Sequence, residues 1–242
     1  MEKDLKKKVI ILGASSDIGI EIVQLYLTKG YTILAHYNKG NKKFFNLHNK
    51  NKNRISLFKY DFLKTQKNLS DYFSKKFFKN CSVLINASAH LTEIKPNKIN
   101  TKVVIDHFKV NLFPSLFLML KFGPEMNKNK WGRIVNLGSI GVKFGGGRLN
   151  LPYSLSKHSL EFFPSITKEW VKNNVLVNTI RVGSTNTKLH NKLPSKNLKK
   201  RTSLIPMKRM AEPKEIAEYV YFIGSEENTY ISNQILSISG GE

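Results

Sequence analysis

A tyrosine and a lysine four residues apart form a pair that could do proton chemistry. They are Tyr153 and Lys157, in the run Tyr-Ser-Leu-Ser-Lys. Side chains at this spacing lie on one face of a helix, one turn from each other. A free tyrosine has a pKa of about 10, and a cation held beside it favours the phenolate. The pair could therefore serve as a general acid and base for a carbonyl or an alcohol, although the spacing also suits a plain solvated helix face.

A run of small residues near the N-terminus has the composition of a phosphate-binding turn. Residues 7–12 predict a buried strand, Gly13 to Gly19 reads Gly-Ala-Ser-Ser-Asp-Ile-Gly, and residues 18–29 predict an amphipathic helix. Small residues let a pyrophosphate approach the backbone, and the helix N-terminus supplies N–H groups. An ordinary strand-to-helix connection is the alternative, because Asp17 stands where the usual fingerprint has a glycine.

The end of the second predicted strand, residues 31–37, bears on the choice of nicotinamide cofactor. A site for NAD normally places a carboxylate here, on the ribose 2′-hydroxyl. The chain instead reads His-Tyr-Asn-Lys, ending in Asn38 and Lys39, with Lys42 and Lys43 just beyond and no acid. This favours a 2′-phosphate and hence NADP(H) over NAD(H), unless the lysines are only solvated surface residues.

The remaining chain alternates between predicted strands and predicted helices. The alternation predicts an α/β fold, a Rossmann-type doubly wound parallel sheet of about seven strands with helices on both faces. Ligands of such sheets bind at the carboxyl ends of the strands, where the clusters above fall. No repeat or linker divides the chain, so we expect one domain over 1–242 with a substrate loop at about 184–211. Further strands are expected at 55–60, 82–86, 132–137, 175–182 and 234–238, and further helices within 40–54 and at 63–78, 102–126, 153–172 and 213–225, with bends near Pro114 and Pro164.

Composition limits the classes of protein to consider. The chain has 242 residues, enough for one large core, and a formal charge of +23. That charge would suit an acidic partner, but abundant Lys, Asn, Ile and Phe are also what AT-rich codons produce. The single cysteine, Cys81, excludes an internal disulfide framework and fits a reducing, cytoplasmic location. The longest apolar stretch, residues 112–120, is interrupted by Pro114 and Ser115, so we expect no membrane span.

Taken in order, these motifs resemble a known family, the short-chain dehydrogenases/reductases of the compact single-domain type. The likeness extends over about residues 7–241. It rests on the glycine run at 13–19, the segment 86–89, Asn111, the strand before Ser139, the Tyr153–Lys157 pair, and the segments 178–187 and 206–241. The chain departs from the family pattern at Leu12, Asp17, residues 87–89 and Val182, but keeps all four positions that match the family's catalytic set.

The resemblance implies that Ser139, Tyr153, Lys157 and Asn111 form this catalytic set. Tyr153 would donate a proton to the substrate oxygen, while Lys157 would lower the pKa of Tyr153 and hold the nicotinamide ribose. Ser139 would hydrogen-bond the substrate carbonyl. Asn111 would hold a water molecule that links Lys157 to solvent.

The resemblance also implies a cofactor site. Its pyrophosphate would be lined by Gly13, Ser15, Ile18 and Gly19. Asp61 would face the adenine, Asn86 the adenosine ribose, and Thr187 the carboxamide or a phosphate. The further cofactor-binding residues that we expect are Ser16, Asn38, Lys39, Phe62, Ala87, Gly183 and Thr185, and we expect no metal.

The function implied is NADP(H)-dependent reduction of a carbonyl, or oxidation of the alcohol, by hydride transfer. The tail at 205–213 is similar to that of 3-oxoacyl-carrier-protein reductases, so a 3-oxoacyl thioester is one candidate substrate. The basic loop at 188–209 would suit a substrate that is acidic or carrier-bound. A sugar or nucleotide-sugar reductase of surface polysaccharide synthesis is the alternative.

Two other classes of protein fit the sequence less well. A non-catalytic nucleotide-binding protein on the same fold is disfavoured because the full catalytic set is kept. A nucleic-acid-binding protein is suggested only by the charge, since the sequence has no nucleic-acid-binding signature. Relatives usually assemble as dimers or tetramers through helices that resemble 102–126 and 153–172, so we expect a homodimer or homotetramer.

Overall fold

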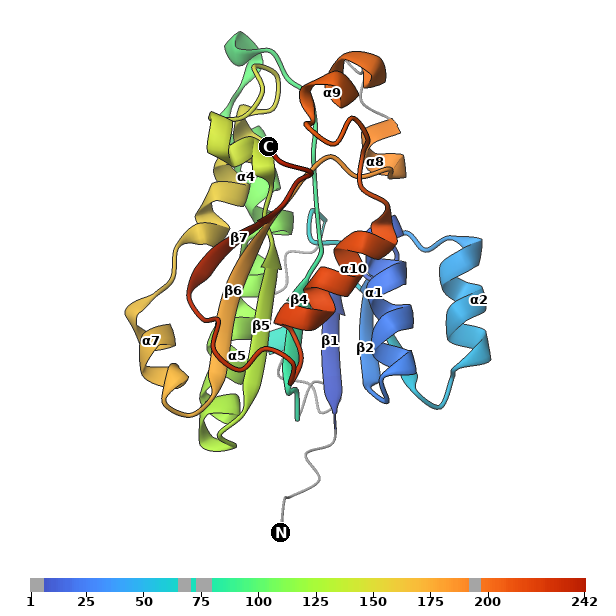
Figure 1. The fold of residues 1–242 in the computed structure, drawn as a ribbon, viewed down its shortest axis with the longest axis vertical. Helices are drawn as coiled ribbons and strands as arrows, with labels where there is room; N and C mark the ends of the chain where they lie inside the picture. The colour runs from blue at the N-terminus through green and yellow to red at the C-terminus, as the bar shows by residue number, and fades with distance from the viewer. Residues whose placement is uncertain (1–6, 65–70, 73–79, 192–196) are drawn as a thin grey trace.

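Seven parallel strands form one sheet in the computed structural model, which describes residues 7–64, 71–72, 80–191 and 197–242. The strand order is β3-β2-β1-β4-β5-β6-β7 (Figure 1), which confirms the predicted Rossmann-type α/β fold. The strands are β1 (Lys8–Leu12), β2 (Thr32–Tyr37), β3 (Ile55–Lys59), β4 (Val83–Asn86), β5 (Gly132–Leu137), β6 (Val175–Val182) and β7 (Gln234–Ile238).

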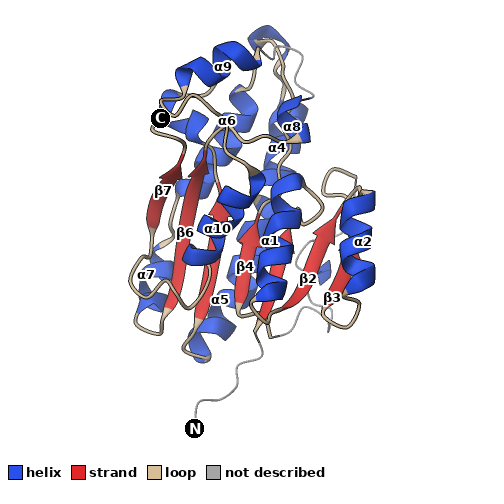
Figure 2. Cartoon of the chain, turned by 45° about the vertical axis from the view of Figure 1, so that its right-hand side comes forward, coloured by secondary structure: helices blue, strands red, loops and turns tan. Residues whose placement is uncertain are grey.

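Helices cover both faces of this sheet because alternate side chains of each strand point to opposite faces. Val9 and Ile11 pack toward α1 (Asp17–Thr28) and α10 (Pro213–Ile223), beside α2 (Lys42–Lys50). Ile10 and Leu12 pack in the second core, toward α5 (Phe113–Lys128) and α7 (Ser165–Val171). Figure 2 shows α8 (Lys188–Asn191) and α9 (Leu198–Leu204) beyond the carboxyl ends of the strands. The remaining helical elements are η2 (Pro96–Lys98), α4 (Thr101–Asn111), η3 (Ile140–Phe144), α6 (Leu151–His158) and η4 (Ser159–Glu161).

The register of the central strands aligns the ends of three chain segments. Leu12 pairs with Asn86, Asn86 pairs with Asn136, and Leu137 pairs with Ile180. The residues that follow these positions therefore leave the sheet side by side. This places the glycine turn, the segment after β4 and the segment after β5 along one edge, as the sequence predicted.

The helix predicted at 102–126 is present as two consecutive helices that divide next to Pro114. The first part, α4, ends at Asn111, and α5 begins at Phe113, after Leu112, whose φ of −112° lies outside the usual helical range. Pro114 stands in the first turn of α5, where its missing N–H costs no hydrogen bond.

The prediction of one helix over 153–172 is wrong. The α6 helix ends at His158, η4 follows, and α7 begins only at Ser165. Pro164 has no N–H and disfavours the helical conformation of the residue before it, so the chain becomes extended instead of kinking. At this break, Glu161 is buried and accepts two hydrogen bonds of 2.7 Å from the Arg181 guanidinium on β6.

Two other expected elements are the helix at 63–78 and the substrate loop at 184–211. The predicted helix at 63–78 lies largely outside the described residues. The segment at 184–211 contains the short helices α8 and α9 and reaches back to the sheet, because Thr185 bridges to Ala211.

One stretch, Thr101–Lys128, is long and apolar enough to cross a membrane by length and composition alone, with a hydropathy of 1.4. Pro114 and Ser115 interrupt the apolar stretch at 112–120, so the sequence predicts no membrane span. A helix that packs into a core passes the same test. Leu118, Phe122 and Met126 on α5 are indeed buried against the sheet.

Candidate active site

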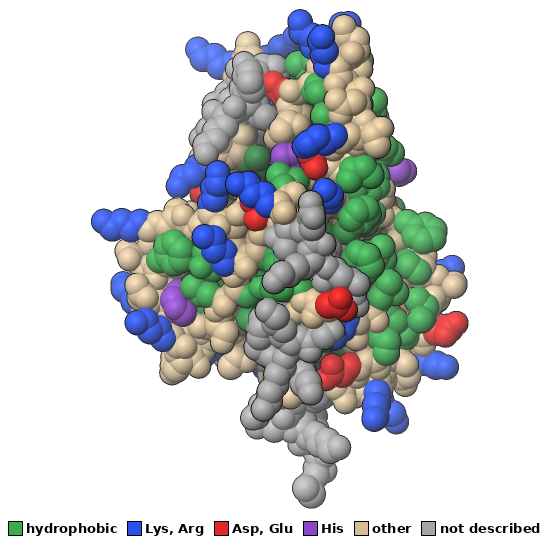
Figure 3. All heavy atoms as spheres, turned by 180° about the vertical axis from the view of Figure 1, so that it is seen from behind, with side chains coloured by type: hydrophobic (Ala, Val, Ile, Leu, Met, Phe, Trp, Pro, Cys, Tyr) green, Lys and Arg blue, Asp and Glu red, His purple; other side chains and the backbone are tan. Residues whose placement is uncertain are grey.

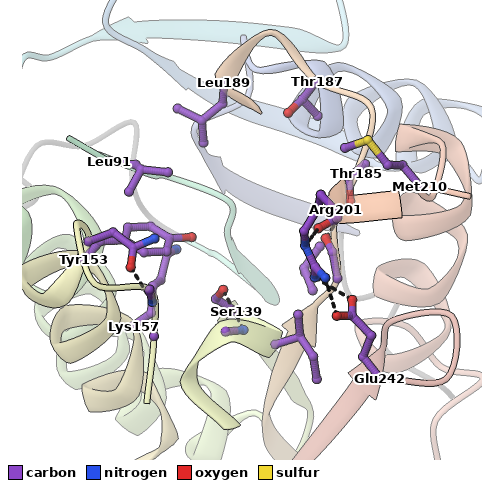
Figure 4. Close-up of a pocket in the computed structure, with 18 of the residues that line it drawn as sticks. Leu91, Ser139, Tyr153, Lys157, Thr185, Thr187, Leu189, Arg201, Met210 and Glu242 are labelled. Carbon is purple, nitrogen blue, oxygen red and sulfur yellow. Dashed lines mark hydrogen bonds and ion pairs between the residues drawn. The ribbon is translucent and has the colours of Figure 1, made fainter. Parts of the chain in front are cut away.

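A cavity of about 830 Å³ opens at the carboxyl ends of the strands. Its walls come from the segment after β4, the segment after β5, α6, and the 184–211 segment with α9 (Figure 4). Ser139, Tyr153 and Lys157 all line it. Three of the four predicted catalytic residues therefore share one cavity.

Tyr153 and Ser139 are in direct contact across this cavity. Tyr153 lies in the first turn of α6, and Ser139 follows β5 and caps η3, accepting from the N–H of Gly141 at 3.3 Å. Burial raises the pKa of Tyr153, and a hydrogen bond with Ser139 opposes that rise. Tyr153 therefore keeps its proton near neutrality, which suits a proton donor.

Lys157 is a buried amine, only 2% exposed. Its Nζ donates to the carbonyl oxygens of Leu137 at 2.7 Å and Ser88 at 3.1 Å. Burial lowers the pKa of Lys157 to about 7. We expected Lys157 to lower the pKa of Tyr153, but in this structure burial makes that pKa higher than usual, and the opposing contribution comes from Ser139.

Asn111 is buried at the end of α4 and does not line the cavity. Its amide Nδ2 donates to Ser156 Oγ at 2.8 Å and to the carbonyl of His90, while its Oδ1 accepts from the N–H of His90 at 2.7 Å. The Asn111 side chain thus ties the segment after β4 to α6, beside Lys157. A water relay through Asn111 stays a prediction.

The glycine turn has the form that a pyrophosphate needs. Gly13 has a φ of 72°, and a Cβ there would lie 2.5 Å from the carbonyl oxygen of Ala87. Ser16 caps α1, accepting from the N–H of Gly19 at 3.0 Å. The N–H groups of Asp17 and Ile18 have no acceptor within the described ranges. Two free backbone donors at a helix N-terminus fit an anionic ligand.

Asp17, the departure from the glycine pattern, links this turn to the substrate loop. Its Oδ2 accepts from the N–H of Lys188 at 2.7 Å, at the start of α8. The carboxylate therefore spans from the first turn of α1 to the segment that follows Thr187.

His36 at the end of β2 holds the glycine turn from the other side. Its Nδ1 accepts from the N–H of Gly13 at 3.1 Å, and its Nε2 lies 2.9 Å from the carbonyl of Tyr60. These contacts require the neutral ring with the proton on Nε2. Burial lowers the pKa of His36 to about 4, which keeps the ring in that form.

The expected 2′-phosphate residues lie next to the glycine turn. Ser15 Oγ donates to the carbonyl of Lys39 at 3.2 Å, and the Asn41 amide donates to the carbonyl of Ser15. Asn38 and Lys39 follow β2 at the surface, outside the cavity. Lys43 is ion-paired with Glu21 on α1 at 2.7 Å.

Other predicted cofactor residues are engaged within the protein. Asn86 is fully buried, and its side chain bonds Ser88 and the carbonyl of Asn111. Phe62 packs on the His36 ring with centroids 4.5 Å apart, and Asp61 accepts from the N–H of Leu63. The cavity itself is lined by seven residues of the predicted cofactor set: Ile18, Ala87, Tyr153, Lys157, Gly183, Thr185 and Thr187.

Sequence reasoning missed the far wall of the cavity. Arg201 and Glu242 form an ion pair there, and Leu91, Phe144 and Met210 supply apolar surface. No motif or spacing joins these residues, which come from several helices and loops. Among the described residues, no cluster of His, Cys, Asp and Glu is placed to hold a metal ion.

Comparison with known proteins identifies the family of this chain. The model of a family described as enoyl-(acyl carrier protein) reductase matches residues 13–242. A 3-oxoacyl-(acyl-carrier-protein) reductase of Buchnera aphidicola subsp. Schizaphis graminum is 28% identical over 239 residues, 98% of this chain and 97% of the relative. A second, from Buchnera aphidicola subsp. Baizongia pistaciae, is 30% identical over 254 residues, 99% of this chain and 98% of the relative.

Solved structures share the fold. A 3-oxoacyl (acyl-carrier-protein) reductase of Agrobacterium tumefaciens C58 with NADP bound has a TM-score of 0.84 at 18% identity, covering 98% of this chain and 94% of that one. ElxO with NADP bound has a TM-score of 0.83 at 22% identity, covering 97% of this chain and 98% of that one.

The family model and the relatives that span the whole chain show that it belongs to the short-chain dehydrogenase/reductase family. It is an oxidoreductase of that family.

Proposed function

We propose that this protein reduces a carbonyl compound with NADP(H), or oxidises the corresponding alcohol, with Ser139, Tyr153 and Lys157 as its catalytic residues and Asn111 as their support. The observation that carries the proposal is the meeting of a protonated Tyr153, its partner Ser139 and the buried Lys157 in one cavity at the strand ends. When bound, the nicotinamide supplies or accepts the hydride.

The roles of the side chains follow from their surroundings. Tyr153 has a raised pKa, so it gives its proton to the substrate oxygen during reduction and holds the oxygen in place with Ser139. The protonated form of Lys157, present at and below a pH of about 7, uses two of its three N–H donors on Leu137 and Ser88. The third donor is available for a hydroxyl of the nicotinamide ribose. Asn111 keeps the segment after β4 against α6 and so fixes the position of Lys157.

The choice of NADP(H) over NAD(H) rests on the end of β2. Among the described residues 36–43 there is no acid that could bind a ribose 2′-hydroxyl. Asn38 and the exposed Lys39 follow β2 next to Ser15 of the glycine turn, where a cation would stabilise a 2′-phosphate. The NADP found in structures of the same fold supports this choice.

The substrate class that we favour is a 3-oxoacyl thioester. Two observations support it: relatives that span the whole chain are 3-oxoacyl-(acyl-carrier-protein) reductases, and the cavity walls include Leu91, Phe144 and Met210, which suit an acyl chain. The alternative, a sugar or nucleotide sugar, would need more polar walls. We propose that residues 184–211 form the substrate loop of a single domain over 1–242.

The test is turnover by the purified protein. We expect oxidation of NADPH, followed by its absorbance, with 3-oxoacyl thioesters and little turnover with nucleotide sugars that carry a keto group. The same assay with NADH should give a lower kcat/KM. Turnover of the sugars but not of the thioesters would mean that the protein is a sugar or nucleotide-sugar reductase. NADPH binding without turnover on any carbonyl would favour a nucleotide-binding protein.

We further propose a cytoplasmic homodimer or homotetramer without a nucleic-acid role. The outer surfaces of α4 to α7 expose large apolar side chains, and Phe162 is 76% exposed. Figure 3, which views the molecule from behind, shows hydrophobic side chains gathered on one half of that face. Contiguous apolar surface of this kind marks a protein interface. The large apolar side chains that are exposed on these helices include Ile105, Phe117, Leu120, Leu155, Ile166 and Val171.

Light scattering tests the assembly. We expect a mass of two or four times that of the 27.7 kDa chain. Phe162→Asp should lower that mass, because burying an unpaired carboxylate at an interface is costly. Tyr230→Asp, at a side chain that is 95% exposed, is the matched control and should leave the mass unchanged. A single-chain mass for the unmodified protein would contradict the assembly.

A further inference from the structure

An ion pair lies in the cavity wall away from Tyr153 (Figure 4). Arg201 on α9 donates from Nη1 and Nη2 to the two carboxylate oxygens of Glu242, at 2.5 and 2.6 Å. Its Nε donates to Ser184 Oγ at 2.8 Å. The side chain of Glu242 is only 7% exposed, whereas that of Arg201 is 32% exposed. The carboxylate is thus the buried partner, and the guanidinium is the more accessible one.

The cluster of Arg201, Glu242 and Ser184 has hydrogen-bond donors that make no contact within it. A guanidinium carries five N–H groups, and the contacts above use three of them. The hydroxyl of Ser184 accepts from Arg201, and its own proton has no acceptor within the part of the chain that the structure describes. Ser184 is buried and lines the cavity. A buried donor without an acceptor costs free energy, so a ligand oxygen placed here would be stabilised.

The charge of the cluster decides which oxygen it would accept. Glu242 already neutralises Arg201 through a bidentate contact. A carboxylate or phosphate of the substrate would have to displace Glu242 or lie beside its negative charge. A neutral carbonyl oxygen needs only the spare donors and meets no such repulsion. The cluster therefore disfavours anions, despite the basic composition of the loop that carries Arg201.

We propose that Ser184 and Arg201, held by Glu242, bind a second and neutral carbonyl oxygen of the substrate while Ser139 and Tyr153 hold the reacting one. This inference rests on the proposed reductase function and narrows its substrate class. The favoured compounds carry an ester, thioester or amide carbonyl near the ketone. The corresponding 3-oxo carboxylates are disfavoured, and simple ketones lack the second contact.

Three other charged side chains line the cavity, Glu93, Lys157 and Lys200, and none of them belongs to the donor set of Arg201 and Ser184. Lys157 is held by backbone carbonyls on the opposite wall, beside Tyr153. Lys200 also lines the cavity and lies next to Arg201 in sequence, but it is exposed, so water and salt screen its charge. Lys200 therefore provides a matched control for a positive charge on α9 that is outside the donor set.

The experiment compares kcat/KM for three substrates of one chain length: a 3-oxo ester, the 3-oxo carboxylate and a simple ketone. In the unmodified protein the ester should be preferred to both. Ser184→Ala and Arg201→Met should each lower the ratio of ester to ketone, with Arg201→Met lowering it by about tenfold, since a hydrogen bond from a charged donor is worth about 1.5–3 kcal/mol. Lys200→Gln should leave the ratio unchanged.

Glu242→Gln should change the preference between the ester and the 3-oxo carboxylate in favour of the carboxylate. This variant therefore distinguishes an effect of charge on the substrate from a structural effect on α9. Removing the carboxylate leaves Arg201 with an unbalanced charge, so the kcat/KM of the 3-oxo carboxylate should rise relative to that of the ester, by about tenfold. Equal losses on all three substrates in every variant would show that the pair only clamps α9, and would overturn the inference. Dissociation constants of ester and carboxylate, measured by calorimetry on the NADP-loaded protein, test the same preference without turnover. Absence of turnover would refute the reductase proposal, while these constants would still decide the inference.

Discussion

Tyr153→Phe should lower the turnover of every carbonyl substrate by roughly 10²–10⁴-fold, the usual contribution of a general acid. The variant removes the hydroxyl that contacts Ser139 and keeps the ring in its place. Because the hydroxyl acts on the substrate oxygen, binding of NADPH should stay within a few-fold of the unmodified value. Steady-state kinetics and fluorescence titration with NADPH measure the two quantities separately.

The control for this variant is Tyr230→Phe. Tyr230 is almost fully exposed and lies outside the cavity lining, so its loss of a hydroxyl should leave turnover unchanged. If Tyr153→Phe retained turnover within a few-fold, another group would have to supply the proton. The assignment of Tyr153 as the acid would then be lost.

Lys157→Met should abolish most of the turnover and weaken NADPH binding as well. Methionine has nearly the same length as lysine but lacks the ammonium group, so the donor for the ribose disappears. The carbonyls of Ser88 and Leu137 also lose their donor, and a buried acceptor without a partner costs roughly 1–3 kcal/mol. This double loss of turnover and cofactor affinity differs from the expectation for Tyr153→Phe.

The pH dependence of stability checks the burial of the same lysine. The pKa of Lys157 falls from 10.5 to about 7 on folding. Between these pH values only the unfolded chain binds the proton, so the free energy of unfolding should rise with pH from about 7 to about 10.5. Denaturant titrations of both proteins should show this rise in the unmodified protein relative to Lys157→Met. A difference between the two that is flat over this range would mean that Lys157 is not buried as described.

The sequence predicted those features whose cause is local. Gly13 and Gly19 signal a tight turn because side chains there would meet the backbone. The strand pattern predicted seven parallel strands because continuous apolar runs suit a sheet covered on both faces. The helical spacing of Tyr153 and Lys157 follows from the geometry of one turn. These signals are all contained in short windows of sequence.

Features that depend on distant contacts were not predictable in this way. Glu242 lies 41 positions from Arg201, and no periodicity connects the two. The direction of the pKa of Tyr153 depends on burial by surrounding elements and on Ser139, fourteen positions away in sequence. Pro164 signalled an interruption, but a kink and a complete break have the same sequence signature. Packing beyond the proline decided between them.

The break after η4 has a mechanical consequence for catalysis. The α6 helix, which carries both Tyr153 and Lys157, is only eight residues long and is not continuous with α7. Three residues after the end of α6, Glu161 accepts two hydrogen bonds from Arg181 on β6 of the sheet. A displacement of α7 is therefore passed to the sheet through Glu161 and Arg181 before it reaches α6. The positions of Tyr153 and Lys157 then depend little on what binds to the outer surface of α7.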